Sequence, residues 1–163
     1  HMFQKFGVLA VVFILFLTSA SAQGVFSCTG PGLSALYNID LGSLGKKKLK
    51  ANFADAMGGA DAYSYSRDGT VKVITAAFES DAGRAEMNFY LQDENSYLME
   101  YHIVQNSNFY AEPDSVILTD ERSFYHVCDG ELLAPAFGGI INEEIYDNLR
   151  LVFDLILIEA TEE

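Results

Sequence analysis

The feature that most constrains the fold is a series of short segments, between residues 63 and 128, in which apolar and polar side chains alternate. In residues 85–92 every second side chain is apolar, and residues 97–104 follow a similar pattern. Such alternation is typical of strands with one face on a core and one towards solvent. Because turn-forming residues separate these segments at 67–69, 81–84 and 93–96, the sequence predicts an antiparallel meander.

Further strands are expected on either side of these two. The pattern places them at residues 63–66, 70–78, 115–119 and 124–128, with another turn at 120–122.

The C-terminal part of the chain changes to a helical period. Asn142 is a candidate N-cap, and Glu143 and Glu144 would lie in the first turn, where the helix dipole favours acids. Apolar residues then recur at helical spacing from Ile145 to Leu157. The almost wholly apolar run 151–158 leaves a buried strand as the alternative.

These patterns together predict an α+β fold. We expect a single curved antiparallel sheet, a meander that is either open or partly closed into a barrel, packed by the C-terminal helix. The expected core residues are Val73, Met87, Phe89, Leu91, Met99, Tyr101, Ile103, Leu149, Val152 and Phe153.

Residues 46–57 fit two structures. Leu49, Phe53, Ala56 and Met57 form a helical stripe that Gly58 would end, whereas Leu49, Ala51 and Phe53 also alternate as in a strand. The helix is preferred here, although three lysines at its start oppose the helix dipole.

The N-terminus resembles a secretory signal peptide. Lys5 is followed by an uncharged apolar run over 7–17 and the small residues Ala20-Ser21-Ala22, which suggests mature residues 23–163 forming one domain. His1 before Met2 is interpreted as a cloning scar. The run is shorter than the about 20 residues that span a bilayer, so we expect a secreted or periplasmic protein. Cleavage as a lipoprotein before Cys28 and a retained anchor are the alternatives.

Cys28 and Cys128 are the only cysteines. In an oxidising compartment they would form one disulfide. They lack the spacing of a zinc site. A reactive thiol at Cys128 is the alternative, because His126 would lie on the same face of a strand.

The chain is strongly acidic, with 23 acidic and 10 basic residues and a net charge of −13. This balance argues against nucleic acid and anionic membrane surfaces as partners. It is compatible with a cationic protein partner, whose approach the field would speed. Solubility alone is the competing explanation for the charge.

Motifs for catalysis are missing from the sequence. It contains no GxSxG, phosphate-binding loop, GxGxxG, HExxH or EF-hand pattern, and no cofactor or metal is expected. His102 and His126 are the available general bases once His1 is set aside. A hydrolase using His102 or His126 is therefore the weakest of three function classes.

Tyrosines supply the remaining candidates for a site. Tyr63, Tyr65, Tyr90 and Tyr125 lie on or near predicted strands, and exposed tyrosines are good contact residues. The sequence thus favours an exported non-catalytic binding module, such as an inhibitor or interaction protein for a cationic protein partner. The alternative is a small-ligand carrier with an apolar pocket between sheet and helix.

Overall fold

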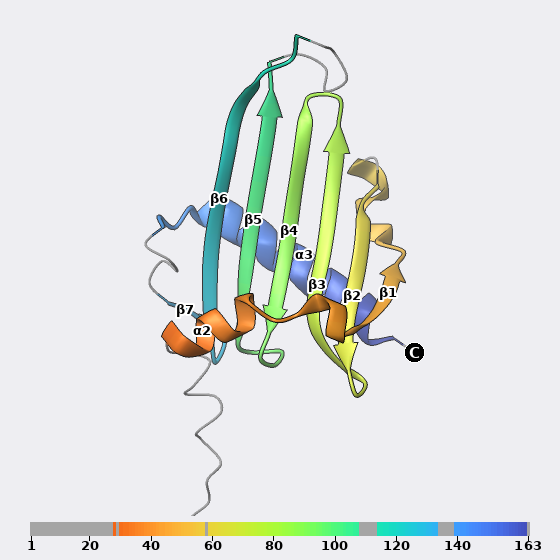
Figure 1. Ribbon diagram of the computed structural model, residues 1–163, viewed down its shortest axis with the longest axis vertical. Helices are drawn as coiled ribbons and strands as arrows, with labels where there is room; N and C mark the ends of the chain where they lie inside the picture. The colour runs from red at the N-terminus through yellow and green to blue at the C-terminus, as the bar shows by residue number, and fades with distance from the viewer. Residues whose placement is uncertain (1–27, 29, 58, 108–113, 134–138, 163) are drawn as a thin grey trace, which may run out of the picture.

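The computed structural model describes residues 28, 30–57, 59–107, 114–133 and 139–162. The expected signal peptide, 2–22, lies outside the described residues. The described chain forms one antiparallel sheet of seven strands in sequence order (Figure 1). The strands are β1 (Gly45–Leu49), β2 (Asp61–Arg67), β3 (Thr70–Ser80), β4 (Gly83–Leu91), β5 (Tyr97–Asn106), β6 (Ile117–Cys128) and β7 (Glu131–Leu132). The sheet is an open meander, not a closed barrel, and the predicted α+β class is confirmed.

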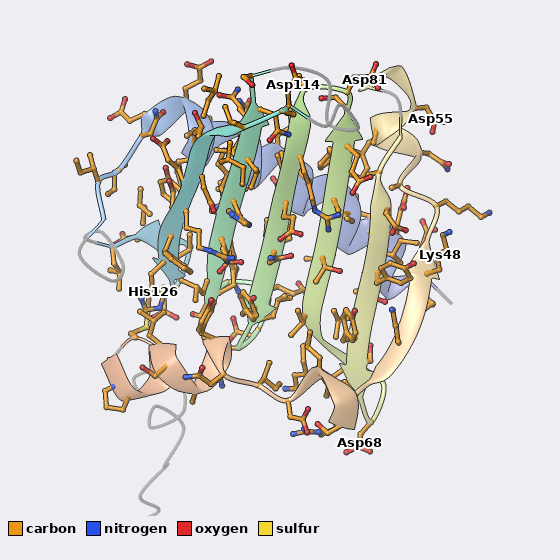
Figure 2. The ribbon with its side chains drawn as sticks, turned by 45° about the horizontal axis from the view of Figure 1, so that its top comes forward. Lys48, Asp55, Asp68, Asp81, Asp114 and His126 are labelled. Carbon is orange, nitrogen blue, oxygen red and sulfur yellow. A yellow bond between two sulfur atoms is a disulfide. The ribbon has the colours of Figure 1, made fainter. Side chains whose placement is uncertain are left out.

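Among the described residues, two α-helices lie on opposite faces of the sheet. Helix α3 (Glu143–Thr161) crosses the far face of the sheet in Figures 1 and 2. Helix α2 (Gly30–Tyr37) lies in front of the sheet, at the lower ends of the strands. Two short 3₁₀ helices, η1 (Leu41–Ser43) and η2 (Asn52–Met57), flank β1. We call the face against α3 the covered face and the other the open face.

The predicted cap and the first hairpin are both present. The Asn142 side chain accepts a hydrogen bond from the Ile145 N–H, 3.1 Å away, which fixes the start of α3. Asp68 and Gly69 join β2 to β3 with φ angles of 52° and 77°, as a two-residue hairpin turn requires.

The core lies between the covered face and α3. Phe153 of α3 stacks on Tyr97 of β5 with ring centroids 4.1 Å apart, and Phe89 of β4 packs beside it. Of the predicted core, the buried members are Val73, Phe89, Leu91, Met99, Leu149, Val152 and Phe153, and the half-buried ones are Met87, Tyr101 and Ile103. Large side chains therefore fill the centre of the space between sheet and helix.

The helix preferred for residues 46–57 was wrong. The segment forms strand β1 followed by η2, because Leu49 is buried in the core while the side chains of Lys46, Lys47 and Lys48 remain exposed. Ala51, with a φ of 51°, separates the two elements.

The turn predicted at 120–122 was also wrong. Strand β6 runs unbroken through it, because Asp120 contacts His102 and Arg122 contacts Glu100 on the neighbouring strand β5. These charges have partners across the sheet and need no turn.

The sequence patterns did not predict helix α2, whose segment begins with Gly30, Pro31 and Gly32, residues typical of turns. Pro31 is tolerated in its first turn, and Leu33 packs with Leu98 of β5 on the open face. Tertiary packing thus stabilises a segment whose composition suggests a loop.

The expected disulfide joins Cys28 to Cys128, with Cα atoms 5.9 Å apart. It links the start of α2 to the end of β6. Such a bond fits an extracellular or otherwise oxidising compartment. None of the helices in the described part of the chain is long and apolar enough to cross a membrane.

Candidate functional site

Above α2, the open face carries a network of charged and polar side chains. Glu100 lies at its centre and is only 2% exposed. The Asn88 side-chain amide donates to its Oε1 over 2.8 Å, and the Arg122 guanidinium lies 3.5 Å from its Oε2. Burial, and next the charge of Glu100, raise the pKa of the Tyr37 hydroxyl. The buried carboxylate thus has hydrogen-bonding and cationic partners within the fold.

His102 lies beside this centre, between two carboxylates. Its Nε2 is 2.7 Å from Asp120 Oδ1 on β6, and its Nδ1 is 3.6 Å from Glu86 Oε2 on β4. Arg84 in turn donates to Glu86 and forms an ion pair with Glu79. Because its two ring nitrogens face carboxylates on β4 and β6, His102 links three neighbouring strands.

His126 is buried near the lower end of β6, above α2 (Figure 2). Its backbone carbonyl accepts a hydrogen bond from the Leu133 N–H. Cys128, two residues on, is held in the disulfide, so the thiol that His126 could have activated does not exist in this state. Across the described residues, no group of three or more His, Cys, Asp or Glu side chains is arranged to hold a metal ion.

The four candidate tyrosines do not form one surface. Tyr63 and Tyr65 are half-buried on the open face, where the Lys46 ammonium lies 4.0 Å from the first ring centroid and 5.9 Å from the second. Tyr90 packs against Tyr37 of α2, and burial strongly raises the pKa of its hydroxyl. Tyr125 is 1% exposed in the core under α3. Only Tyr63 and Tyr65 are therefore brought together where a partner could reach them.

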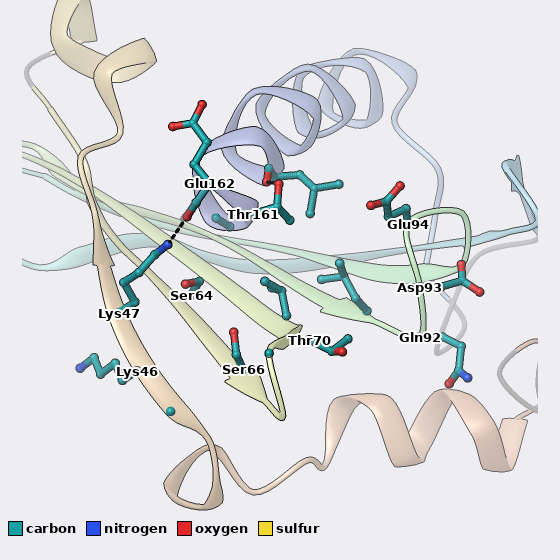
Figure 3. A pocket seen from close by; sticks show the side chains of 16 residues that line it. Lys46, Lys47, Ser64, Ser66, Thr70, Gln92, Asp93, Glu94, Thr161 and Glu162 are labelled. Carbon is teal, nitrogen blue, oxygen red and sulfur yellow. Dashed lines mark hydrogen bonds between the residues drawn. The ribbon is translucent and has the colours of Figure 1, made fainter.

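A groove of about 690 Å³ opens at the C-terminal end of α3, between the helix and the lower end of the sheet (Figure 3). Its apolar lining comes from Val71, Leu91, Leu157 and Ala160. The rest of the lining is polar and includes Ser64, Ser66 and Thr70, together with positively and negatively charged side chains. The Lys47 ammonium, which donates to the Glu162 carbonyl over 2.9 Å, closes one side.

The outer face of α3 is the most acidic helical surface of the described chain. Glu143, Glu144, Asp147 and Asp154 are exposed there, and no ion pair within the described residues involves them. Arg150 is the one base between Glu143 and Thr161. Its guanidinium turns towards the sheet, 5.7 Å from the Tyr97 ring centroid.

Apolar side chains lie among these acids. Leu151, Leu155 and Ile158 are 60%, 41% and 59% exposed. Sequence reasoning missed this surface, because the run 151–158 was weighed only as core, in a helix or a buried strand. The signal was present, since apolar residues at 149, 151, 152, 153, 155, 156, 157 and 158 cover more of a helix than one buried face needs.

In comparisons with known proteins, no family model, no curated protein and no solved structure matches this chain.

Proposed function

We propose that this protein is an exported, secreted or periplasmic, non-catalytic binding module for a cationic protein partner. The observation that carries the proposal is the unpaired acidic surface of α3. Four exposed carboxylates lie on it, and its single base, Arg150, is directed at Tyr97 and Tyr146.

The open face supports the same conclusion by contrast. Glu86, Glu100 and Asp120 each lie within 3.6 Å of a nitrogen of Arg84, Arg122 or His102. These carboxylates have nitrogen partners within the fold, whereas no ion pair within the described residues involves the four exposed acids of α3. A field of one sign over one surface steers oppositely charged partners and speeds their encounter.

The test measures binding to immobilised cytochrome c and ribonuclease A as cationic probes, with ovalbumin as the acidic control. We expect retention by both cationic probes at about 0.02 M salt and loss of most binding at about 0.3 M, where the Debye length is shorter. The variant Asp147→Lys/Asp154→Lys should weaken retention, whereas Asp81→Lys/Asp114→Lys adds the same charge far from α3 and should weaken it less. Absence of retention at low salt would refute the proposal and leave solubility as the explanation for the charge.

The groove favours a second candidate function, a small-ligand carrier. Its volume of about 690 Å³ is in the range of small-molecule sites, and its apolar residues lie between sheet and helix. An environment-sensitive amphiphile such as anilinonaphthalene sulfonate should bind with saturable fluorescence. Thr70→Trp, which fills the groove from an exposed position, should abolish that signal, whereas Asp81→Trp on a distant turn should not. Equal signals from the two variants would exclude the groove.

A further inference from the structure

We infer that the outer face of α3 is the docking surface and that it binds a basic amphipathic helix of the partner. This inference rests on the proposed function and names the surface and the kind of partner. The contact would be formed by Leu151, Leu155 and Ile158, which we call the outer stripe, and by the acids beside it.

The spacing of the outer stripe matches a helix-binding seam. Its members follow one another at four and three residues, so they lie on one side of α3 over about two turns. The inner side is formed by other residues, Leu149, Val152, Phe153 and Ile156, which are buried against the sheet. The outer stripe is therefore not needed for the core.

Exposed apolar side chains rimmed by polar ones mark interaction surfaces. Each outer-stripe residue is at least 41% exposed, and two of them have an exposed acid three or four positions away: Asp147 and Asp154 for Leu151, and Asp154 for Ile158. Glu143 and Glu144 extend the negative rim to the N-terminal end of α3.

The negative charge of the acids beside the outer stripe decides which kind of partner could cover it. A second copy of α3 would bring like charges together, because its only base, Arg150, points at the sheet. An anionic membrane would be repelled for the same reason. A helix with apolar side chains at i, i+4 and i+7 and Lys or Arg beside them would bury the stripe and pair with the rim. The observed charge therefore favours a basic amphipathic helix.

The experiment uses a fluorescein-labelled model peptide with leucines at helical spacing and lysines on both sides, and a scrambled peptide of equal composition. Fluorescence anisotropy should give at least tenfold tighter binding for the amphipathic peptide. Leu151→Ser/Ile158→Ser should weaken it at least tenfold, and Asp147→Asn/Asp154→Asn should weaken it and reduce its salt dependence. The matched controls are Ile117→Ser, an equally exposed apolar residue on β6, and Asp81→Asn, an exposed acid on a turn; both should bind as the unchanged protein does.

The outcomes separate this inference from the proposed function. If the stripe variants bind the peptide as the controls do, while cationic proteins are still retained at low salt, the docking surface is wrong and the proposed function stands. If neither cationic proteins nor the peptide bind, the proposed function fails first. Sedimentation that shows a dimer of the unchanged protein, lost in Leu151→Ser/Ile158→Ser, would identify a second copy as the occupant and overturn the inference. Circular dichroism of each variant checks that the fold is kept.

Discussion

Replacement of Glu159 should destabilise the protein more than replacement of any other acid on α3. Its two carboxylate oxygens accept hydrogen bonds from the backbone N–H groups of Ala51, over 2.7 Å, and Asn52, over 3.1 Å. Ala51 is 1% exposed and has a φ of 51°. Glu159 therefore fixes the unusual backbone that joins β1 to η2 and attaches it to the C-terminal end of α3.

The magnitude follows from the burial of the two donors. A hydrogen bond to a charged group contributes about 1.5–3 kcal/mol, and two bonds to one carboxylate are not additive. In Glu159→Ala the exposed Asn52 N–H can bond to water, whereas the N–H of buried Ala51 loses its acceptor. We therefore expect a loss of about 2–3 kcal/mol in unfolding free energy. Glu159→Gln keeps one acceptor oxygen and should lose about half as much.

Urea denaturation followed by circular dichroism measures the effect, with equal slopes required for the comparison. Glu144→Ala is the matched control, because Glu144 is an exposed acid of the first turn and should cost no more than about 1 kcal/mol. If Glu159→Ala proved as stable as Glu144→Ala, the reasoning that Glu159 holds the β1–η2 junction would be refuted.

Three further predictions concern the rest of the fold. Thiol titration of the denatured, unreduced protein should find no free cysteine, and Cys28→Ser/Cys128→Ser should lower stability by up to about 4–5 kcal/mol, since the bond closes a separation of 100 residues; two titratable thiols would contradict this. Gly83→Ala should cost about 1–3 kcal/mol in urea unfolding, because the added Cβ would collide with a backbone carbonyl oxygen of β5, whereas Gly30→Ala faces open space and serves as the control. Burial raises the pKa of Tyr97 to about 12 from 10.0. The contribution of this shift to the unfolding free energy should therefore be complete below pH 10 and lost as the pH rises through 12. Tyr97→Phe should flatten that part of the pH–stability curve, and an unchanged curve would contradict the assignment.

Local patterns were sufficient for the centre of the sheet and for α3. The alternation in 85–92 predicted β4, and the Asp68-Gly69 turn and the Asn142 cap both formed where their chemistry predicted. These features depend on neighbours in sequence, so a single chain shows them. The turn predicted at 120–122 is absent because Asp120 and Arg122 contact His102 and Glu100 of β5, a strand that begins 20 residues before β6.

The same limit explains which parts of the candidate site could be predicted. Tyr63 and Tyr65 share a face because they are two residues apart on one strand, which alternation alone predicts. Whether Tyr125 is exposed or buried depends on which face of the sheet α3 covers, and no local sequence pattern contains that information. The outer stripe was hidden for a related reason, since its residues are interleaved with core residues and only the packed helix separates the two sets.

The distribution of charge bears on whether acidity serves solubility or binding. Acidic residues alone keep a surface soluble, whereas large apolar side chains exposed beside them favour association. On α3 the two occur together, with Leu151 and Ile158 more than half exposed near Asp147 and Asp154. On the open face the acids are instead paired with Arg84, His102 and Arg122. The helix combines a steering charge with an apolar contact, which is the combination that a partner of opposite charge would use.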